Sequence, residues 1–570
     1  MEKKMNTPHI IQKPARMQLI IVLAAAFAFI PFLGGVHLFD WDEANFAESA
    51  REMITSGNYL QVQVDYVPFW EKPPLFIWMQ VASMKVFGVN EFAARLPNAI
   101  CGIFTLLIIF RIGRRLYNER FALYWVLFYG CSWLPLSYFK SGIIDPWFNL
   151  FIFAGIYGFV RYIDQLKKVP FEKSVIRWLV ISSFFLGLAV LTKGPVAILV
   201  FVLAFGVFFL LARGKMPLRL PHILIFVLVL ALVGGFWFIL QIANGNSKLI
   251  LDFIRYQVKL FSTHDAGHGG FLLYHFIVLL FGVFPASLFA IPALFAKQSS
   301  TETQALFERW MKILFWTVLI LFTIVKTKIV HYSSLCYFPL TFLASLYAYK
   351  LFTSGKRPAK WLRLSILVYG VLIAILVALV PFLDRFKGFI ISHGWISDSF
   401  AVANLQANGG WTGLEGGISL WLLAGIIVFL SNRSKLQVAL YGLLIGTAGF
   451  MLGVLILYAP RIEKYSQGAA IDFYKKMAGK AVFVNTLEFK SYACLFYTGK
   501  PGRLAEEPDS ALKYLTCKLD RDAYFLCKIN RREHFLKNYP QLEYLYDKNG
   551  FVFLLRPYRN TDSLRYTPYK

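Results

Sequence analysis

Residues 17–36 read MQLIIVLAAAFAFIPFLGGV and contain no charged side chain. A helix of this length matches the roughly 30 Å hydrocarbon core of a bilayer. Similar runs recur up to residue 458, and their hydropathy predicts about thirteen membrane spans. The chain of 570 residues is 57% hydrophobic and only 16% charged. These proportions exclude an ordinary soluble protein and predict an all-α polytopic membrane protein.

The segment before residue 17 is basic and allows two interpretations of the first span. A basic segment followed by an apolar run with small residues is also the pattern of a signal peptide. The acidic stretch that follows offers no convincing cleavage site, so we favour an uncleaved membrane anchor.

The net charge of +27 would suit a nucleic-acid-binding protein if the basic residues formed one stripe. They are instead spread through short loops, and an even number of proposed spans separates each cluster from the next. The positive-inside rule therefore places all of these clusters in the cytoplasm, with membrane lipids and not nucleic acid as neighbours. The clusters are residues 3–16, 111–120, 167–177, 213–219, 350–363 and 433–435.

An odd number of spans leaves the C-terminus outside, together with the polar segments 40–95, 245–270 and 384–413 and the stretch around Asp145. The first of these contains two amphipathic stretches, 43–56 and 74–87, which we expect to lie along the membrane interface. The tail changes character, because short strand-like runs alternate with Pro-Gly and Asn-Gly turns. These runs are residues 480–485, 492–497, 524–529 and 551–555. We predict a transmembrane domain over 1–458 and a small soluble α/β or α+β domain over 459–570.

Charged side chains gather at the outer ends of the predicted spans, and charges next to a bilayer are candidates for function. Asp42, in the run Asp40-Trp41-Asp42-Glu43, is a candidate general base for an acceptor hydroxyl, with Glu43 beside it. The alternative for Asp42 is a solvated acidic turn or a helix N-cap.

Three lysines also stand at these ends. Lys72 precedes two prolines, whose fixed backbone suits the presentation of an ammonium group to a phosphate; the alternative is an ordinary surface lysine. Lys193 interrupts an apolar run, with snorkelling to the interface as its alternative, and Lys328 follows a later span.

A carboxylate and a histidine-bearing loop complete the set. Asp145 follows a short polar turn and is expected to orient a lysine or to bind the acceptor. His264, Asp265 and His268 are possible metal ligands or acid/base groups, although their spacing does not form a closed zinc pattern and a solvated loop is the alternative. No Gly-x-x-x-x-Gly-Lys-Ser/Thr loop occurs, so no nucleotide cofactor is expected.

Several short motifs resemble, in their order along the chain, those of the GT-C membrane glycosyltransferases. The similarity is to the lipid A aminoarabinose transferases and their relatives the protein O-mannosyltransferases. The motifs are Asp42-Glu43-Ala44-Asn45-Phe46-Ala47-Glu48, Glu71-Lys72-Pro73-Pro74, Ala94-Arg95-Leu96-Pro97, Asp145, Lys193-Gly194-Pro195 and His331-Tyr332.

The resemblance implies transfer of a sugar from a polyprenyl-phosphate donor, in a cavity open to the periplasmic side of a bacterial inner membrane. The acceptor would be lipid A, or an exported protein in the mannosyltransferase branch. By this resemblance Asp42 is the catalytic carboxylate, Lys72 engages the donor phosphate, and Glu71 and His268 hold a divalent metal such as zinc, while Asp145, Lys193 and Tyr332 match further cavity residues. With the charged residues identified above, we expect catalysis by Asp42, Glu43 and Asp145, donor-phosphate binding by Lys72, Lys193, Lys328 and Tyr332, and further cavity positions for His264 and His331.

This chain departs from the aminoarabinose branch at Asn45 and Phe46, where that branch carries arginine and tyrosine. The change removes a phosphate or acceptor contact but keeps the catalytic carboxylate, so the sugar and the acceptor stay open. The soluble tail favours lipid A over protein. A transporter is disfavoured, because the charges cluster at span ends and no internal repeat is evident.

Overall fold

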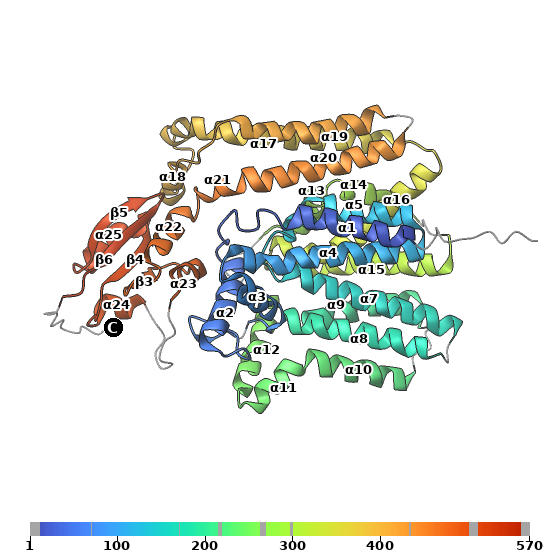
Figure 1. Ribbon diagram of the computed structural model, residues 1–570, viewed down its shortest axis with the longest axis horizontal. Helices are drawn as coiled ribbons and strands as arrows, with labels where there is room; N and C mark the ends of the chain where they lie inside the picture. Colours follow the sequence, from blue (N-terminus) through green and yellow to red (C-terminus); the bar gives the residue numbers. More distant parts are fainter. Residues whose placement is uncertain are drawn as a thin grey trace, which may run out of the picture.

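The computed structural model describes residues 12–69, 71–169, 172–214, 219–262, 270–296, 300–432, 435–500 and 511–559. Long helices make up most of these residues, and a small sheet lies at one end of the helical bundle (Figure 1). The chain is therefore a mostly helical protein with a small C-terminal mixed sheet, as the sequence predicts.

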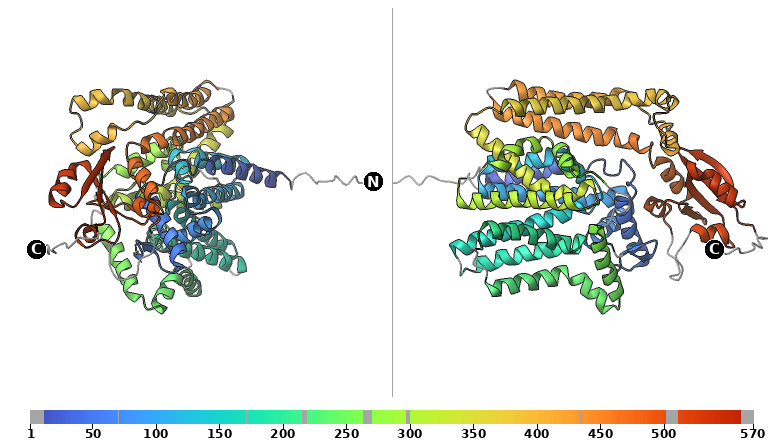
Figure 2. Two further views of the ribbon diagram at one scale, coloured as in Figure 1. Left: turned by 60° about the vertical axis from the view of Figure 1, so that its left-hand side comes forward. Right: turned by 180° about the vertical axis from the view of Figure 1, so that it is seen from behind.

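The long helices run along one common direction (Figure 1). They are α1 (Gln12–Phe29), α4 (Glu91–Leu116), α5 (Glu119–Cys131), α7 (Asp145–Lys168), α8 (Lys173–Lys193), α9 (Val196–Leu211), α10 (Leu220–Gly234), α14 (Ala286–Phe295), α15 (Glu302–Ile324), α16 (Tyr337–Thr353), α17 (Lys360–Ser392), α19 (Ser419–Ser431) and α20 (Leu436–Leu457). Helices α17, α19 and α20 form one edge of the bundle, and α10 lies at the opposite edge (Figures 1 and 2).

Six helical segments of the described chain are long and apolar enough to cross a membrane. The number rises to eight if each of two bent pairs, α10 with α11 (Phe236–Ala243) and α13 (Tyr274–Gly282) with α14, is one span. The protein is thus a multi-span membrane protein. The sequence predicts about thirteen spans, which is more than this criterion of length and composition identifies. The larger number therefore stays a prediction.

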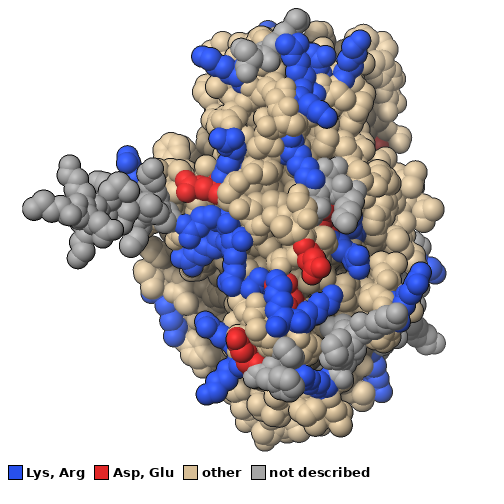
Figure 3. Space-filling model, turned by 90° about the vertical axis from the view of Figure 1, so that its right-hand side faces the viewer, with Lys and Arg blue, Asp and Glu red and all other residues tan. Residues whose placement is uncertain are grey.

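Basic residues mark the end of the bundle that lies away from the sheet. Helix α4 ends with Arg114 and Arg115, α7 ends with Lys167 and Lys168, and α16 carries Lys350 in its last turn. Figure 3 shows lysine and arginine side chains spread over this end face. This distribution is the one that the positive-inside rule predicts for a cytoplasmic end.

Shorter elements cover the opposite end of the bundle. The two predicted amphipathic stretches are indeed helical, as α2 (Asp42–Ser56) and α3 (Leu75–Phe87). The expectation that both lie along the membrane interface is wrong for α2, because every residue from Glu43 to Met53 is buried inside the protein. The other short elements are β1 (Gln63–Val64), β2 (Val67–Pro68), α6 (Trp133–Tyr138), α12 (Ser247–Ser262), η1 (Val330–Cys336), α18 (Ser399–Leu405), η2 (Leu414–Ile418) and α21 (Ala459–Glu463).

The tail contains one four-stranded mixed sheet in the order β3-β4-β6-β5. Strand β3 (Phe483–Thr486) pairs parallel with β4 (Ala523–Lys528), and β6 (Phe551–Arg556) pairs antiparallel with β4 and with β5 (Glu543–Lys548). Asn549 and Gly550 join β5 to β6 with φ angles of 50° and 80°, as the predicted Asn-Gly turn requires. The helices of the tail are α22 (Gly468–Met477), α23 (Tyr492–Thr498), α24 (Ala511–Thr516), η3 (Ile529–Arg531) and α25 (Arg532–Asn538).

The predicted strand over residues 492–497 is wrong, because this run forms helix α23. The Ser491 hydroxyl accepts a hydrogen bond from the Cys494 backbone N–H at 3.2 Å, as an N-cap does. Gly499 ends the helix with a φ of 63°. The apolar side chains of this short run are buried in a helix that packs on α2, so capping and packing outweigh its strand-like composition. Strand β5 was missed because its residues are exposed and its pattern is not apolar.

The tail is fastened to the segment that follows α1. The Asp40 carboxylate accepts hydrogen bonds from the backbone N–H groups of Tyr492 at 2.8 Å and Ala493 at 3.0 Å. The backbone N–H of Leu38 donates to the Tyr497 hydroxyl at 2.7 Å. Residues more than 450 positions apart in sequence are therefore joined by directional bonds.

A buried ionic cluster strengthens the same contact. Arg51 donates to both carboxylate oxygens of Glu48, at 2.7 and 2.6 Å, and to the Lys500 carbonyl at 3.0 Å. Glu52 accepts two backbone N–H groups, and burial together with the neighbouring Glu48 carboxylate raises the pKa of Glu52 to about 9. Arg51 supplies the positive charge that compensates this pair of neighbouring carboxyl groups.

Replacement of Arg51 by methionine should lower the free energy of unfolding by about 3–5 kcal/mol, because it leaves a buried carboxylate without its cation. Thermal unfolding in detergent measures the effect. Arg559→Met is the matched control, since Arg559 and Glu543 form an exposed pair. Equal melting temperatures for the two variants would contradict the assignment.

Candidate functional site

A cavity of about 780 Å³ lies where the bundle, α2 and the tail meet. Its walls come from segments far apart in the sequence, including α2, the start of α7, the end of α8, η1, the end of α20 and the turn before α23. We call it the polar cavity. The predicted site residues that line it are Asp42, Glu43, Glu71, Lys72, Asp145, Lys193, His331 and Tyr332.

His331 stands between two carboxylates. Its Nε2 atom lies 3.5 Å from Asp42 Oδ2 and 3.9 Å from Asp145 Oδ2. Asp42 is the first residue of α2, and the side chain of the preceding Trp41 makes no capping bond, so the N-cap alternative for Asp42 does not hold. The Asp42 side chain is 48% exposed to the cavity, whereas that of Asp145 is 4% exposed. Asp42 is therefore the carboxylate that a ligand can reach.

Lys193 and Lys72 supply positive charge to the wall of the polar cavity. Lys193 Nζ lies 2.6 Å from Asp145 Oδ1 and 5.4 Å from the centre of the Tyr332 ring. Asp145 thus orients a lysine, which was one of its two expected roles.

Burial lowers the pKa of Lys72. The nearby charge of Lys193 lowers it further, while the carboxylates of Glu71, Asp42 and Asp145 act in the opposite direction. Two partly buried ammonium groups that repel each other gain from a bound anion, because the anion offsets their repulsion and the desolvation of Lys72. The pair is suited to a phosphate group.

A small pocket of about 80 Å³ adjoins the polar cavity and shares Lys72, Asp145, Lys193 and Tyr332 with it. We call it the apolar pocket. Most of its remaining wall is hydrophobic, formed by Phe148, Val196, Val200, Phe322, Val325 and Leu335. The two lysines therefore stand at a border between a polar and an apolar space.

Glu43 faces the cavity but its carboxylate is fully engaged. Arg95 donates to it through Nε at 3.0 Å and Nη2 at 2.7 Å, and the backbone N–H groups of Phe39 and Gly142 donate as well. Burial alone would raise the pKa of Glu43, but the Arg95 charge and these hydrogen bonds lower it overall. This carboxylate is poorly suited to accept a proton, so the predicted catalytic role of Glu43 is corrected to a positioning role.

Lys328 is not among the residues that line the polar cavity. Its Nζ donates to the carbonyls of Phe322, Thr323 and Val325 at 3.0, 2.6 and 2.6 Å. These carbonyls belong to the last turn of α15 and the residue after it, where a cation satisfies orphan acceptors. The predicted donor-phosphate role of Lys328 is replaced by a helix-capping role.

The predicted metal pair is described only in part. Glu71 lines the polar cavity, while His264 and His268 lie outside the described residues. Within the described ranges, no three His, Cys, Asp or Glu side chains come together as a metal site would require. The metal remains an expectation for Glu71 and His268.

The cavity residues that were not predicted as site residues include Lys140, Lys490 and Tyr492. Lys140 donates to carbonyls at and just after the end of α1, and burial, aided by the charge of Arg95, lowers its pKa to about 8. It is a lone lysine at a span end, so the criterion that found Lys193 could have found it. Lys490 and Tyr492 come from the tail, and no local pattern relates them to residues more than 400 positions earlier.

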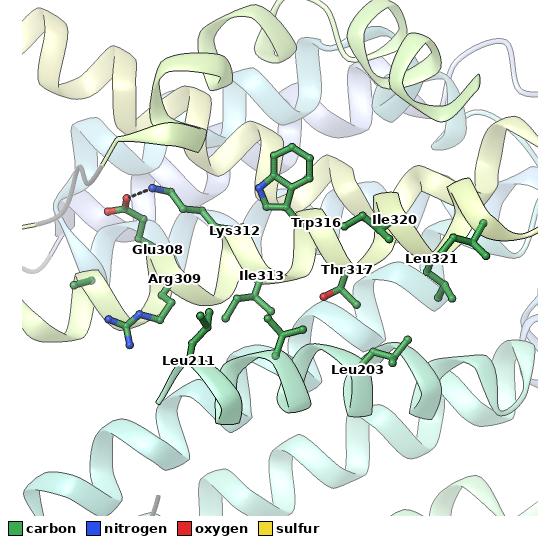
Figure 4. A pocket seen from close by; sticks show the side chains of 13 residues that line it. Leu203, Leu211, Glu308, Arg309, Lys312, Ile313, Trp316, Thr317, Ile320 and Leu321 are labelled. Carbon is green, nitrogen blue, oxygen red and sulfur yellow. Dashed lines mark ion pairs between the residues drawn. The ribbon is translucent and has the colours of Figure 1, made fainter. Parts of the chain in front are cut away.

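A second large cavity, of about 810 Å³, lies between α9 and α15 (Figure 4). Leu203 and Leu211 of α9 face Ile313 and Thr317 of α15 across it, and the Glu308–Lys312 ion pair of 2.8 Å also contributes to the lining. None of the predicted site residues lines this groove. The chemistry suggested by the sequence belongs to the polar cavity.

The chain is similar to several known proteins. Residues 71–238 match the family described as dolichyl-phosphate-mannose-protein mannosyltransferase. The undecaprenyl phosphate-alpha-4-amino-4-deoxy-L-arabinose arabinosyl transferase of Pectobacterium carotovorum subsp. carotovorum (strain PC1) is 25% identical over 432 residues, which are 71% of this chain and 74% of that protein.

Two crystal structures share the fold. ArnT from Cupriavidus metallidurans bound to undecaprenyl phosphate has a TM-score of 0.69 at 18% identity, over 97% of this chain and 100% of that one. The apo state has a TM-score of 0.71 at 18% identity, over 96% and 98% of the two chains. The similarity covers both the helical bundle and the tail.

The affinity for a phosphate-bearing lipid should fall as the pH rises. The fall should begin below about pH 10.4, which is the pKa of an ordinary lysine. The reason is the lowered pKa of Lys72, which must be protonated to attract the phosphate. Titration of binding against pH measures the effect, and Lys72→Arg should hold its affinity to higher pH because arginine stays charged. An affinity that is constant up to pH values near 10.4 in the unmodified chain would contradict this role.

Proposed function

Because this chain belongs to the GT-C membrane glycosyltransferases that use a polyprenyl-phosphate sugar, we propose that it transfers a sugar from undecaprenyl phosphate to lipid A. The first candidate for the sugar is 4-amino-4-deoxy-arabinose, which is named for the relative from Pectobacterium carotovorum. The reaction takes place in the polar cavity, on the periplasmic side of a bacterial inner membrane.

One observation carries the proposal: Lys72, Lys193 and Tyr332 stand at the border between the polar cavity and the apolar pocket. A polyprenyl-phosphate sugar has the same division, with a sugar and a phosphate on one side and a hydrocarbon chain on the other. The phosphate binds at the two lysines, the sugar extends towards Asp42, and the first prenyl units enter the apolar pocket.

The transfer step follows from this arrangement. An acceptor hydroxyl gives its proton to the Asp42 carboxylate as its oxygen forms a bond to the anomeric carbon. The bond between that carbon and the phosphate oxygen breaks, and the undecaprenyl phosphate leaves with the bonding electrons. Lys72 and Lys193 stabilise the charge that develops on the phosphate, and Asp145 and His331 hold Lys193 and Asp42 in place.

We further propose that all thirteen long helices of the bundle cross the membrane. Six of these spans and the two bent pairs meet the criterion of length and composition. We add α1, α5, α7, α9 and α15 as the other five spans. The basic end face shown in Figure 3 then lies in the cytoplasm, and the cavity and the tail lie on the periplasmic side.

The second candidate acceptor is an exported protein. The match of residues 71–238 to the protein mannosyltransferase family supports it. Glycan analysis of exported proteins, in cells with and without this chain, separates the two acceptors.

Lipid A from cells that express the chain should carry added mass corresponding to one aminopentose, and Asp42→Asn should abolish this addition. Loss of a general base lowers transfer by about 10²–10⁴-fold. Mass spectrometry of lipid A, with a cell-free assay on polyprenyl-phosphate sugars, measures both. Glu91→Gln is the matched control, since Glu91 pairs with Lys475 outside the polar cavity.

An Asp42→Asn variant as active as Glu91→Gln would remove Asp42 from the mechanism. Unchanged lipid A, together with transfer in the cell-free assay, would keep the enzyme class and move the acceptor to protein or another surface glycan.

A divalent cation, held by Glu71 and His268, is also part of the proposal. The described residues supply only the Glu71 carboxylate, so no part of the transfer step above depends on the metal. The purified chain is expected to contain zinc that is lost in Glu71→Gln, as elemental analysis can measure. Equal zinc content in both proteins would exclude Glu71 as a ligand.

A further inference from the structure

Helix α2 presents a carboxylate, an amide and an aromatic ring to the polar cavity. Asp42, Asn45 and Phe46 all line it. Residues three and four positions apart share a face of an α-helix, so these side chains project to the same side. Helix α2 therefore contributes three neighbouring side chains to the wall beside the candidate base.

Asn45 is distinguished by an unpaired amide oxygen. The residue is only 7% exposed, and its side-chain Oδ1 is buried without a hydrogen-bond partner in the described structure. Among the described residues that line the polar cavity, no other has a buried side-chain polar atom in this condition. An unpaired buried amide oxygen costs about 1–3 kcal/mol, which a bound ligand can recover.

The chemistry of an amide selects the part of the substrate that it can bind. A side-chain amide is neutral and offers both a donor and an acceptor, as a sugar hydroxyl does. The phosphate has its own cations, Lys72 and Lys193, which come from other segments of the chain. Asn45 lies instead on the same helix face as Asp42, where the transferred sugar must sit.

We propose that the Asn45 amide hydrogen-bonds a hydroxyl group of the donor sugar and so fixes the anomeric carbon relative to Asp42. The inference rests on the proposed function and adds to it a specificity-determining residue. A hydroxyl in this position pairs the buried amide, whereas a donor without that hydroxyl leaves it unpaired. Such a site discriminates strongly against the deoxy sugar.

The experiment compares the full chain with Asn45→Ala and Asn45→Leu, using the natural donor and a series of donors that each lack one hydroxyl. Asn45→Leu keeps the branching of asparagine at Cγ and removes the unpaired amide but is larger, so its melting temperature, measured beside that of Asn45→Ala, shows whether the fold tolerates the change. We expect both variants to lower kcat/KM for the natural donor about tenfold to a hundredfold. Asn538→Ala, at an exposed position of the tail, is the control.

The decisive result is a double-mutant cycle between enzyme and substrate. Removal of one particular hydroxyl should lower kcat/KM in the unmodified chain but have no further effect in the Asn45 variants. Inhibition by sugar-free undecaprenyl phosphate should be unchanged in both.

Two results would overturn the inference. Equal penalties for every deoxy donor in the unmodified chain and the variants would mean that Asn45 contacts no donor hydroxyl. A change in the acceptor KM alone, or weaker inhibition by undecaprenyl phosphate, would assign Asn45 to the acceptor or the phosphate. The proposed function fails separately, if the unmodified chain transfers no sugar or Lys72→Ala is as active as the unmodified chain.

Discussion

The buried ion pair between Arg95 and Glu43 determines where the reactive groups stand. Arg95, near the start of α4, also donates to three carbonyl groups in the segment that follows α1. Glu43, near the start of α2, accepts from the backbone of Gly142, in the turn that leads into α7. One pair thus joins four segments. Because helices α2 and α7 begin with Asp42 and Asp145, the same pair brings the two carboxylates to either side of His331.

The C-terminal tail completes the wall of the polar cavity. Its backbone N–H groups bind the Asp40 carboxylate, two residues before Asp42, and Lys490 and Tyr492 contribute to the wall of the cavity. Helix α2 is consequently enclosed on the side away from the bundle as well. An enclosed helix can hold a carboxylate and an amide at fixed positions, which a helix lying on a membrane surface cannot do with the same precision.

The boundary between polar and apolar space explains why one site can handle both parts of a lipid-linked sugar. Burial lowers the pKa of Lys72, and an anion next to Lys72 and Lys193 offsets that cost. The adjoining hydrophobic wall, with Phe148 and Phe322, accepts a hydrocarbon chain without a hydrogen-bond requirement. The arrangement is therefore complementary to an amphipathic ligand and to neither a free sugar nor a simple lipid.

Local composition and motifs are enough to predict the membrane class, the basic clusters between spans, helices α2 and α3, and a common site for Asp42, Lys72, Asp145, Lys193 and His331. These follow from local composition and from motifs, which need no knowledge of distant contacts. Only the tertiary structure decided that Glu43 is held by Arg95, that Lys328 caps α15 and that residues 492–498 form a helix on α2. The role of a charged side chain depends on its partners, and those partners come from segments that only folding brings together.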